Sequence, residues 1–199
     1  MAPVDGLASR AIAVSTVSDP VANDPIELPK PWSDFLKEAD SALSQPVSLT
    51  CIGGFVLTAL YGLPRPTGDI DYIEVQPREA ANEIDEVGGP NSALAKKYRV
   101  CFQNVGIAYW PDQYESRIEE LKLNLRKLKL WVLEPYDLLL SKVPRNSPKD
   151  REDAKYLIRK LNLEFATFNG RWEKEMAPRI GNRERHTLTV DLWKEYFPK

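Results

Sequence analysis

At 199 residues, with 43% hydrophobic and 28% charged side chains, the chain suits one domain, or a small catalytic domain with a helical appendage. No apolar run approaches the roughly 18 residues of a membrane span, and the N-terminus lacks a basic start followed by an apolar stretch, which excludes an evident anchor or signal peptide and predicts a cytoplasmic protein. The net charge of −2 hides an asymmetry, because residues 1–119 hold 9 Lys/Arg and 17 Asp/Glu whereas residues 120–199 hold 18 and 12.

The first 30 residues are small and polar, with scattered prolines and no sustained period, so we predict a flexible N-terminal arm there. Ser33 is then a suitable N-cap for a helix over residues 34–43, whose apolar positions approximate one face. We expect this helix to cover the first strand of a sheet.

The stretch from Leu49 to Val75 reads as strand, glycine turn, helix, loop and strand. The apolar run 47–52 meets Gly53 and Gly54, and an apolar segment over 55–63 follows. Glycines allow a sharp turn with backbone N–H groups close to a ligand, and the helix directs its positive N-terminal end at the same place. This arrangement favours a bound phosphate.

The second strand of this stretch begins with two acids, Asp69 and Asp71, separated by Ile70. Residues two apart on a strand point the same way, so both carboxylates lie on one face. Two like charges so close are unfavourable unless a cation neutralises them, and hard oxygen ligands suit Mg²⁺ or Mn²⁺. The alternative is a tight turn followed by an exposed strand start.

The remaining predicted elements are a mixture of strands and helices. We predict further strands over residues 99–102, 105–109 and 128–133, and helices over 79–84, 92–97, 114–121, 135–143, 147–161, 164–176 and 190–197. The predicted fold class is α/β (α+β), a mixed sheet flanked by helices. It divides into the arm at 1–30, a core at 31–134 and a helical, basic C-terminal part at 135–199.

Together, Gly53-Gly54, a spacer and Asp69-Ile70-Asp71 resemble the signature of the nucleotidyltransferase superfamily with a DNA polymerase beta-like fold. Arg65 and Thr67 extend this to the Arg-x-Thr-x-Asp-x-Asp form of small bacterial members related to abortive-infection toxins, which belong to type IV toxin-antitoxin systems. In this resemblance Arg65 and Thr67 position the triphosphate of the nucleotide. The alternative is that they brace the loop before the strand.

A second cluster lies in the sequence SKVPRNSPKDRED and contains Lys142, Arg145, Asp150 and Asp153. It resembles the Lys, Arg, Asp, Asp pattern of the same small nucleotidyltransferases, in which the lysine contacts nucleotide phosphate. The residues also have plain structural roles: Asp150 as a helix cap with Ser147, Asp153 as a partner of neighbouring basic residues, and Lys142 in solvent.

The superfamily usually supplies a third carboxylate from a later strand, as metal ligand and general base. The two predicted strands NVGIAYW and KLKLWVL contain no acid, and Asp112, just past the first, is the nearest replacement. His186 is the single histidine and Cys51 and Cys101 are expected to be buried free thiols, so a zinc site or a Ser-His-Asp triad is hard to build.

The resemblance implies a metal-dependent enzyme that moves a nucleoside monophosphate from an NTP to a hydroxyl of RNA, such as a tRNA end, or of a protein, with a cognate antitoxin as partner. The missing third acid favours a different class, a catalytically weakened nucleotide-binding or interaction module. A third hypothesis, a small-molecule nucleotidyltransferase of the antibiotic-modifying type, is disfavoured by the basic C-terminal part, which suits a polyanion.

Overall fold

A single mixed sheet organises the part of the chain that the computed structural model describes, residues 25–106 and 109–199. Its strand order is β3-β2-β1-β5-β4. The strands are β1 (Val47–Cys51), β2 (Asp69–Gln76), β3 (Cys101–Asn104), β4 (Glu119–Leu121) and β5 (Leu128–Val132). The central strand β1 runs antiparallel to β2 and parallel to β5, while β2 and β3 are parallel. The prediction of a mixed sheet flanked by helices is confirmed.

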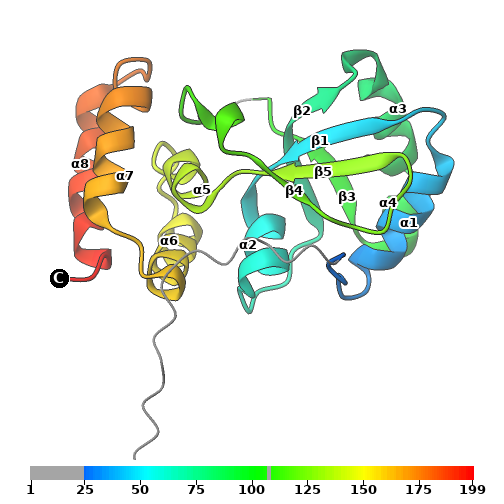
Figure 1. The fold of residues 1–199 in the computed structure, drawn as a ribbon, viewed down its shortest axis with the longest axis horizontal. Coiled ribbons are helices and arrows are strands. Elements are labelled where there is room, and N and C mark those ends of the chain that lie inside the picture. The colour runs from blue at the N-terminus through cyan, green and yellow to red at the C-terminus, as the bar shows by residue number, and fades with distance from the viewer. Residues whose placement is uncertain (1–24, 107–108) are drawn as a thin grey trace, which may run out of the picture.

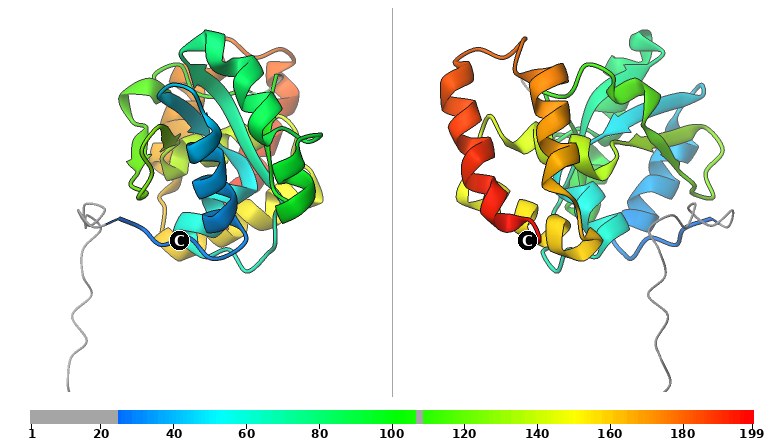
Figure 2. Two further views of the ribbon diagram at one scale, coloured as in Figure 1. Left: turned by 90° about the vertical axis from the view of Figure 1, so that its right-hand side faces the viewer. Right: turned by 60° about the vertical axis from the view of Figure 1, so that its left-hand side comes forward.

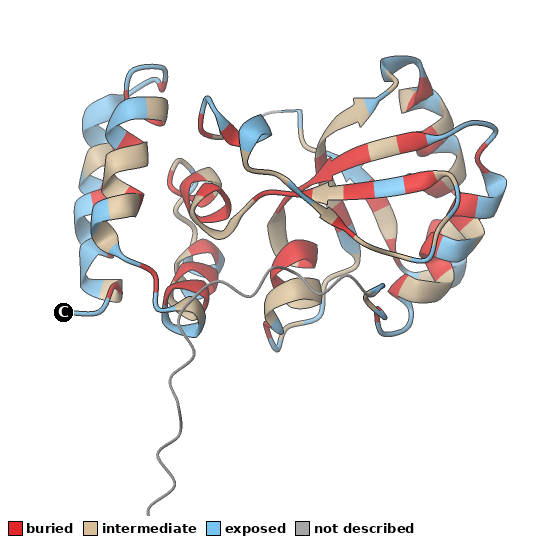
Figure 3. Ribbon diagram, in the orientation of Figure 1, coloured by how far each residue is buried: buried red, intermediate tan, exposed pale blue. Residues whose placement is uncertain are grey.

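The middle of the sheet is largely buried along β1 and β5 (Figure 3). Leu49 of β1 lies beside Val75 of β2 and Leu130 of β5, and both Leu49 and Leu130 are fully buried. Apolar side chains on adjacent strands remove one another from water, which is the main favourable term in folding. The central strands therefore give a rigid base for the loops at their ends.

Helices α1 (Trp32–Ala42), α3 (Ala81–Gly88) and α4 (Ala93–Tyr98) pack against one another at one end of the molecule (Figure 1). Phe35 of α1 joins them to the sheet, because its ring makes an edge contact with Phe102 of β3 at 5.0 Å between centroids. The helix α2 (Gly53–Tyr61) connects β1 to the loop before β2 and packs on β2.

The C-terminal part is helical, as predicted. It contains α5 (Pro135–Lys142), α6 (Pro148–Leu161), α7 (Phe165–Arg171), a π-helical turn (Trp172–Met176) and α8 (Arg183–Trp193). Helices α7 and α8 stand side by side, farthest from α1 and α3 (Figures 1 and 2). Phe168 of α7 stacks on Trp193 of α8, with ring centroids 6.3 Å apart.

Three local predictions were wrong. Residues 114–121 form a short 3₁₀ turn (Tyr114–Ser116) followed by strand β4, because β4 pairs with β5 and tertiary pairing overrides a weak helical pattern. The first helix starts at Trp32 with Pro31 as N-cap, so Ser33 lies inside it. The last helix starts at Arg183, earlier than the predicted residue 190.

Two other predictions concern residues that are partly outside the described ranges. The predicted arm includes residues 1–24, which are not described; in the part that is, Ile26 donates its backbone N–H to the carbonyl of Lys122 at 2.8 Å. The predicted strand 105–109 includes residues 107–108, and the described β3 ends before it, at Asn104. Among the described helices, none is both long and apolar enough to cross a bilayer.

Candidate functional site

The glycine turn between β1 and α2 is closely packed against its neighbours, most tightly at Gly53. Gly53 has φ +80°, and a Cβ there would lie 2.4 Å from Oδ2 of Asp71. A Cβ on Gly54 would lie 3.3 Å from Nη2 of Arg65 and 3.5 Å from Oγ1 of Thr67. The absence of side chains therefore brings this turn, at the N-terminus of α2, against the acidic strand on one side and against Arg65 and Thr67 on the other.

The two acids of β2 occupy unlike environments. Ile70 and Tyr72 are buried, Asp69 is exposed and Asp71 is half-buried, the alternation expected of a strand. Burial raises the pKa of Asp71, the charge of Asp69 raises it further, and Arg145 and Lys142 oppose the rise. The thiol of Cys101 faces Oδ1 of Asp69 at 3.7 Å. The ionised form of Asp71 is thus disfavoured mainly by burial and further by the neighbouring Asp69.

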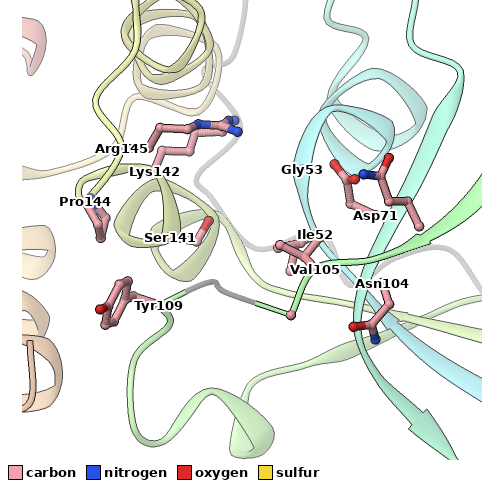
Figure 4. A pocket seen from close by; sticks show the side chains of 12 residues that line it. Ile52, Gly53, Asp71, Asn104, Val105, Tyr109, Ser141, Lys142, Pro144 and Arg145 are labelled. Atoms are coloured by element: carbon pink, nitrogen blue, oxygen red, sulfur yellow. The ribbon is translucent and has the colours of Figure 1, made fainter.

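A cavity of about 570 Å³ opens between the sheet and the end of α5 (Figure 4). Its wall includes Gly53 and Asp71 on the sheet side, and Lys142 and Arg145 on the side of α5. Figure 4 shows Lys142 and Arg145 extending toward Gly53 and Asp71. Oppositely charged groups therefore line one space of a size common for small-molecule ligands.

The second predicted cluster forms a buried ion network beside this cavity. Nζ of Lys142 lies 2.8 Å from Oδ2 of Asp153 and 3.7 Å from Oδ1 of Asp150, and the lysine is only 5% exposed. Nη2 of Arg65 donates to both carboxylate oxygens of Asp153 at 3.0 Å. The structure therefore joins Arg65, on the loop before β2, to Lys142 and Asp153 of the C-terminal helices, and it places Lys142 in the interior instead of in solvent.

Asp150 has two structural partners of its own. Its carboxylate accepts hydrogen bonds from Arg145 Nε at 2.7 Å and from Arg145 Nη2 at 2.6 Å, and it forms a reciprocal capping box with Ser147 at the start of α6. Burial alone would raise the pKa of Asp150, but the hydrogen bonds from Arg145 and Ser147 and the charge of Lys142 lower it to about 2. The carboxylate thus stays ionised and holds Arg145 at the cavity.

The donor set at the acidic strand fits a Mg²⁺-type ion. Within residues 25–106 and 109–199 no three His, Cys, Asp or Glu side chains gather in a way that would hold a metal. Mg²⁺ is commonly bound by one or two carboxylates, with substrate phosphates and water as the other ligands. Asp69 and Asp71 supply two such carboxylates. Burial, and after it the charge of Asp69, raises the pKa of Asp71, and a bound cation would favour the ionised carboxylate.

Asp112 lies elsewhere. Its carboxylate pairs with Arg179, its side chain is 56% exposed, and it does not belong to the cavity wall that contains Asp71. An acid that serves as general base must reach the reacting hydroxyl, and the structure gives no support to Asp112 in that role, because it lies outside the cavity that contains Asp71.

Other polar and aromatic residues of the cavity were missed by sequence reasoning: Gln103, Asn104, Tyr109 and Ser141. Pairing of the strand that contains Gln103 with the acidic strand would have indicated Gln103 as a residue of the site. β3 runs parallel to β2 with Asp71 beside Gln103, and paired residues on adjacent strands point to the same face. The predicted strand at 99–102 ended one residue short of this position, so the pairing could not be recognised.

A comparison with known families bears on this site. Residues 34–198 match the model of a family described as nucleotidyltransferase of unknown function (DUF6036). No curated protein and no solved structure gives a significant match to the chain. The matched region includes the glycine turn, the acidic strand and the ion network.

Proposed function

The chain belongs to this family of nucleotidyltransferases of unknown function, and we propose that it moves a nucleoside monophosphate from an NTP to an acceptor hydroxyl, with release of pyrophosphate. The observation that carries the proposal is the single cavity shared by the glycine turn, Asp71 and the cations of Lys142 and Arg145. Phosphates require N–H donors and positive charge, and a metal-bound triphosphate also requires carboxylates. The cavity wall contains Gly53 of the glycine turn, the carboxylate of Asp71 and the cations of Lys142 and Arg145.

In this proposal Asp69 and Asp71 hold Mg²⁺ or Mn²⁺, whose chemistry when bound is to neutralise charge on the triphosphate and on the leaving pyrophosphate. The backbone N–H groups at Gly53 and Gly54 bind phosphate oxygens at the N-terminus of α2. Lys142 and Arg145 place positive charge where the pyrophosphate develops negative charge, which stabilises the transition state. Arg65 and Asp153 keep the lysine oriented, since Asp153 contacts both.

We further propose that the protein is a member of the polymerase beta-like superfamily and acts as a toxin. The acceptor in this proposal is a hydroxyl of RNA, such as a tRNA end, or of a protein. The excess of basic over acidic residues in 120–199 supports a polyanionic acceptor. A toxin of this kind would act with a cognate antitoxin, which would restrain it in the cell.

A second candidate function is a nucleotide-binding module with weakened catalysis. The observation that favours it is the missing third acid: in the part of the chain that the structure describes, no third carboxylate completes a metal cluster with Asp69 and Asp71. Without a positioned general base a transfer loses about 10²–10⁴-fold in rate.

The test is incubation of the protein with each labelled NTP, Mg²⁺ and total cellular RNA or protein. We expect label in one class of macromolecule and release of pyrophosphate. Asp71→Asn should abolish the transfer. The variant should melt at an unchanged or slightly higher temperature without metal, because the fold raises the pKa of Asp71 and thus disfavours its charged form at neutral pH.

The two readouts separate the candidates. Binding of an NTP without any transfer would select the binding module. A metal-free melting temperature several degrees lower in Asp71→Asn would show that this acid is structural and would remove it from the proposed metal site.

A further inference from the structure

The cavity has a second end, remote from the acids, where Tyr109, Ser141 and Pro144 lie (Figure 4). Tyr109 is 44% exposed, and in the described ranges its ring is paired with no other aromatic ring or cation. An aromatic face exposed to this extent beside a cavity is available to a flat ligand.

The chemistry of this end differs from that of the phosphate end. Ser141 donates its hydroxyl proton to the carbonyl of Leu138 at 2.7 Å, so its oxygen is left as a hydrogen-bond acceptor at the cavity wall. Pro144 adds an apolar ring to the same end of the cavity. One end of the cavity thus suits phosphates, and the other suits a flat ring that carries an N–H.

A nucleoside triphosphate has the same polarity, with charge at one end and a flat base with N–H donors at the other. We propose that Tyr109, Ser141 and Pro144 form the nucleobase subsite for the NTP: the base stacks on Tyr109 beside Pro144 and donates a hydrogen bond to Ser141. This inference rests on the proposed function, since it assigns the remaining part of the same substrate. The cavity of about 570 Å³ lies within the range of small-molecule sites.

One competing occupant uses the same ring. Tyr109 also lines a smaller cavity of about 240 Å³ with Trp110, Met176 and Arg179, which an acceptor base could enter instead. We favour the base of the NTP because Tyr109 shares its larger cavity with the phosphate-binding groups Gly53 and Lys142. The wall of the smaller cavity contains neither the glycine turn nor Lys142.

The experiment is titration calorimetry of the full chain with a non-hydrolysable NTP and, separately, with inorganic tripolyphosphate, each with Mg²⁺. Because stacking of a base on an aromatic ring contributes about 1–3 kcal/mol, Tyr109→Ala should weaken NTP binding roughly 5- to 150-fold. Binding of tripolyphosphate, which has no base, should be unchanged. Lys142→Met should weaken both ligands, because its partner is phosphate.

Two further variants sharpen the result. Tyr109→Phe keeps the ring and should bind the NTP within about twofold of the wild type. Ser141→Ala should change the preference among the four NTPs without changing tripolyphosphate binding.

Two results would overturn the proposal. The first is equal NTP affinity in Tyr109→Ala and the wild type; a raised KM of that variant for the RNA acceptor would then assign the ring to the acceptor. The second is weaker binding of tripolyphosphate by Tyr109→Ala. If the wild-type protein binds neither the NTP nor tripolyphosphate, the proposed function is rejected as well. This result differs from one in which only the nucleobase subsite is wrong, because tripolyphosphate then still binds.

Discussion

At the scale of single residues, we infer from the pairing of Asp71 with Gln103 where a third acid would lie. The two residues are neighbours on parallel strands and line the same cavity. Gln103 is exposed, and its amide is neutral at every accessible pH, so it can orient a hydroxyl but cannot take its proton. We infer that an amide stands where a third carboxylate would lie, so that this position orients a hydroxyl without accepting its proton.

Replacing Gln103 by glutamate should supply that acid. We expect Gln103→Glu to bind Mn²⁺ more tightly and to transfer nucleotide faster by about tenfold or more, since a positioned base contributes about 10²–10⁴-fold. Metal affinity is measured by calorimetry without NTP, and transfer is measured with labelled NTP.

The control is Gln76→Glu, which adds the same charge at the far end of β2, where the strand ends at an exposed residue. It should change neither quantity. If Gln103→Glu leaves both metal affinity and transfer at the wild-type level, Gln103 does not stand in the place of the third acid.

At the scale of an element, the start of helix α6 stabilises the helix and also positions residues of the site. Its first turn is closed by the capping box of Ser147 and Asp150, and Asp153, which holds Lys142 and Arg65, lies in the next turn. A cap of this kind is typically worth about 1 kcal/mol. The ion network of the site thus depends on how this helix begins.

Asp150→Asn tests this with a defined pH dependence. The fold lowers the pKa of Asp150 to about 2, below its ordinary value near 3.9, so the ionised group stabilises the protein above pH 4 and this contribution is lost as the pH falls toward 2. We expect the variant to lose on the order of 2 kcal/mol at pH 7 and progressively less below pH 4, as measured by urea unfolding.

Asp191→Asn is the matched control, because Asp191 is exposed on α8. Its free energy of unfolding should stay within about 0.5 kcal/mol of the wild type throughout. A difference between Asp150→Asn and the wild type that persists undiminished at pH 2 would show that the charge of Asp150 is not the source of the effect.

Features encoded in adjacent residues could be predicted from the sequence, and features made by distant residues could not. The glycine turn, the acidic strand and the cap at Ser147 each depend on a few neighbouring side chains, so their patterns are visible. The contact of Arg65 with Asp153 joins residues 88 positions apart, and no local pattern contains it. Strand β4 was predicted as helix because its pairing with β5, not its own sequence, determines its conformation.

At the scale of the whole molecule, one hydrophobic core extends from Leu28 to Phe197 and includes both the sheet and the C-terminal helices. A second set of buried ion pairs, centred on Asp137, connects the sheet region to the C-terminal helices. Asp137 of α5, which is fully buried, accepts hydrogen bonds from Arg117 Nε at 2.9 Å and from Arg171 Nη1 of α7 at 2.9 Å. Arg117 also reaches Glu175 in the π-helical turn, with Nη2 2.7 Å from Oε2. The sheet and the C-terminal helices should therefore unfold together.

The last prediction concerns this network. Asp137→Asn removes the central charge but keeps the side-chain volume, so two largely buried arginines lose a shared partner. Removal of one member of such a buried pair lowers the free energy of unfolding by about 3–5 kcal/mol. We expect about 3 kcal/mol here, because Glu175 and Glu134 remain as partners of the arginines. Glu173→Gln, which breaks the exposed pair with Arg183, should change the free energy of unfolding by less than about 0.5 kcal/mol. Denaturant unfolding followed by both fluorescence and circular dichroism should give one transition in each variant, with a lower midpoint for Asp137→Asn. Two separate transitions in the wild type would instead mean that the C-terminal helices fold independently of the sheet. Lys142 and Asp153 would then be held at the cavity by their own contacts and not by the shared core.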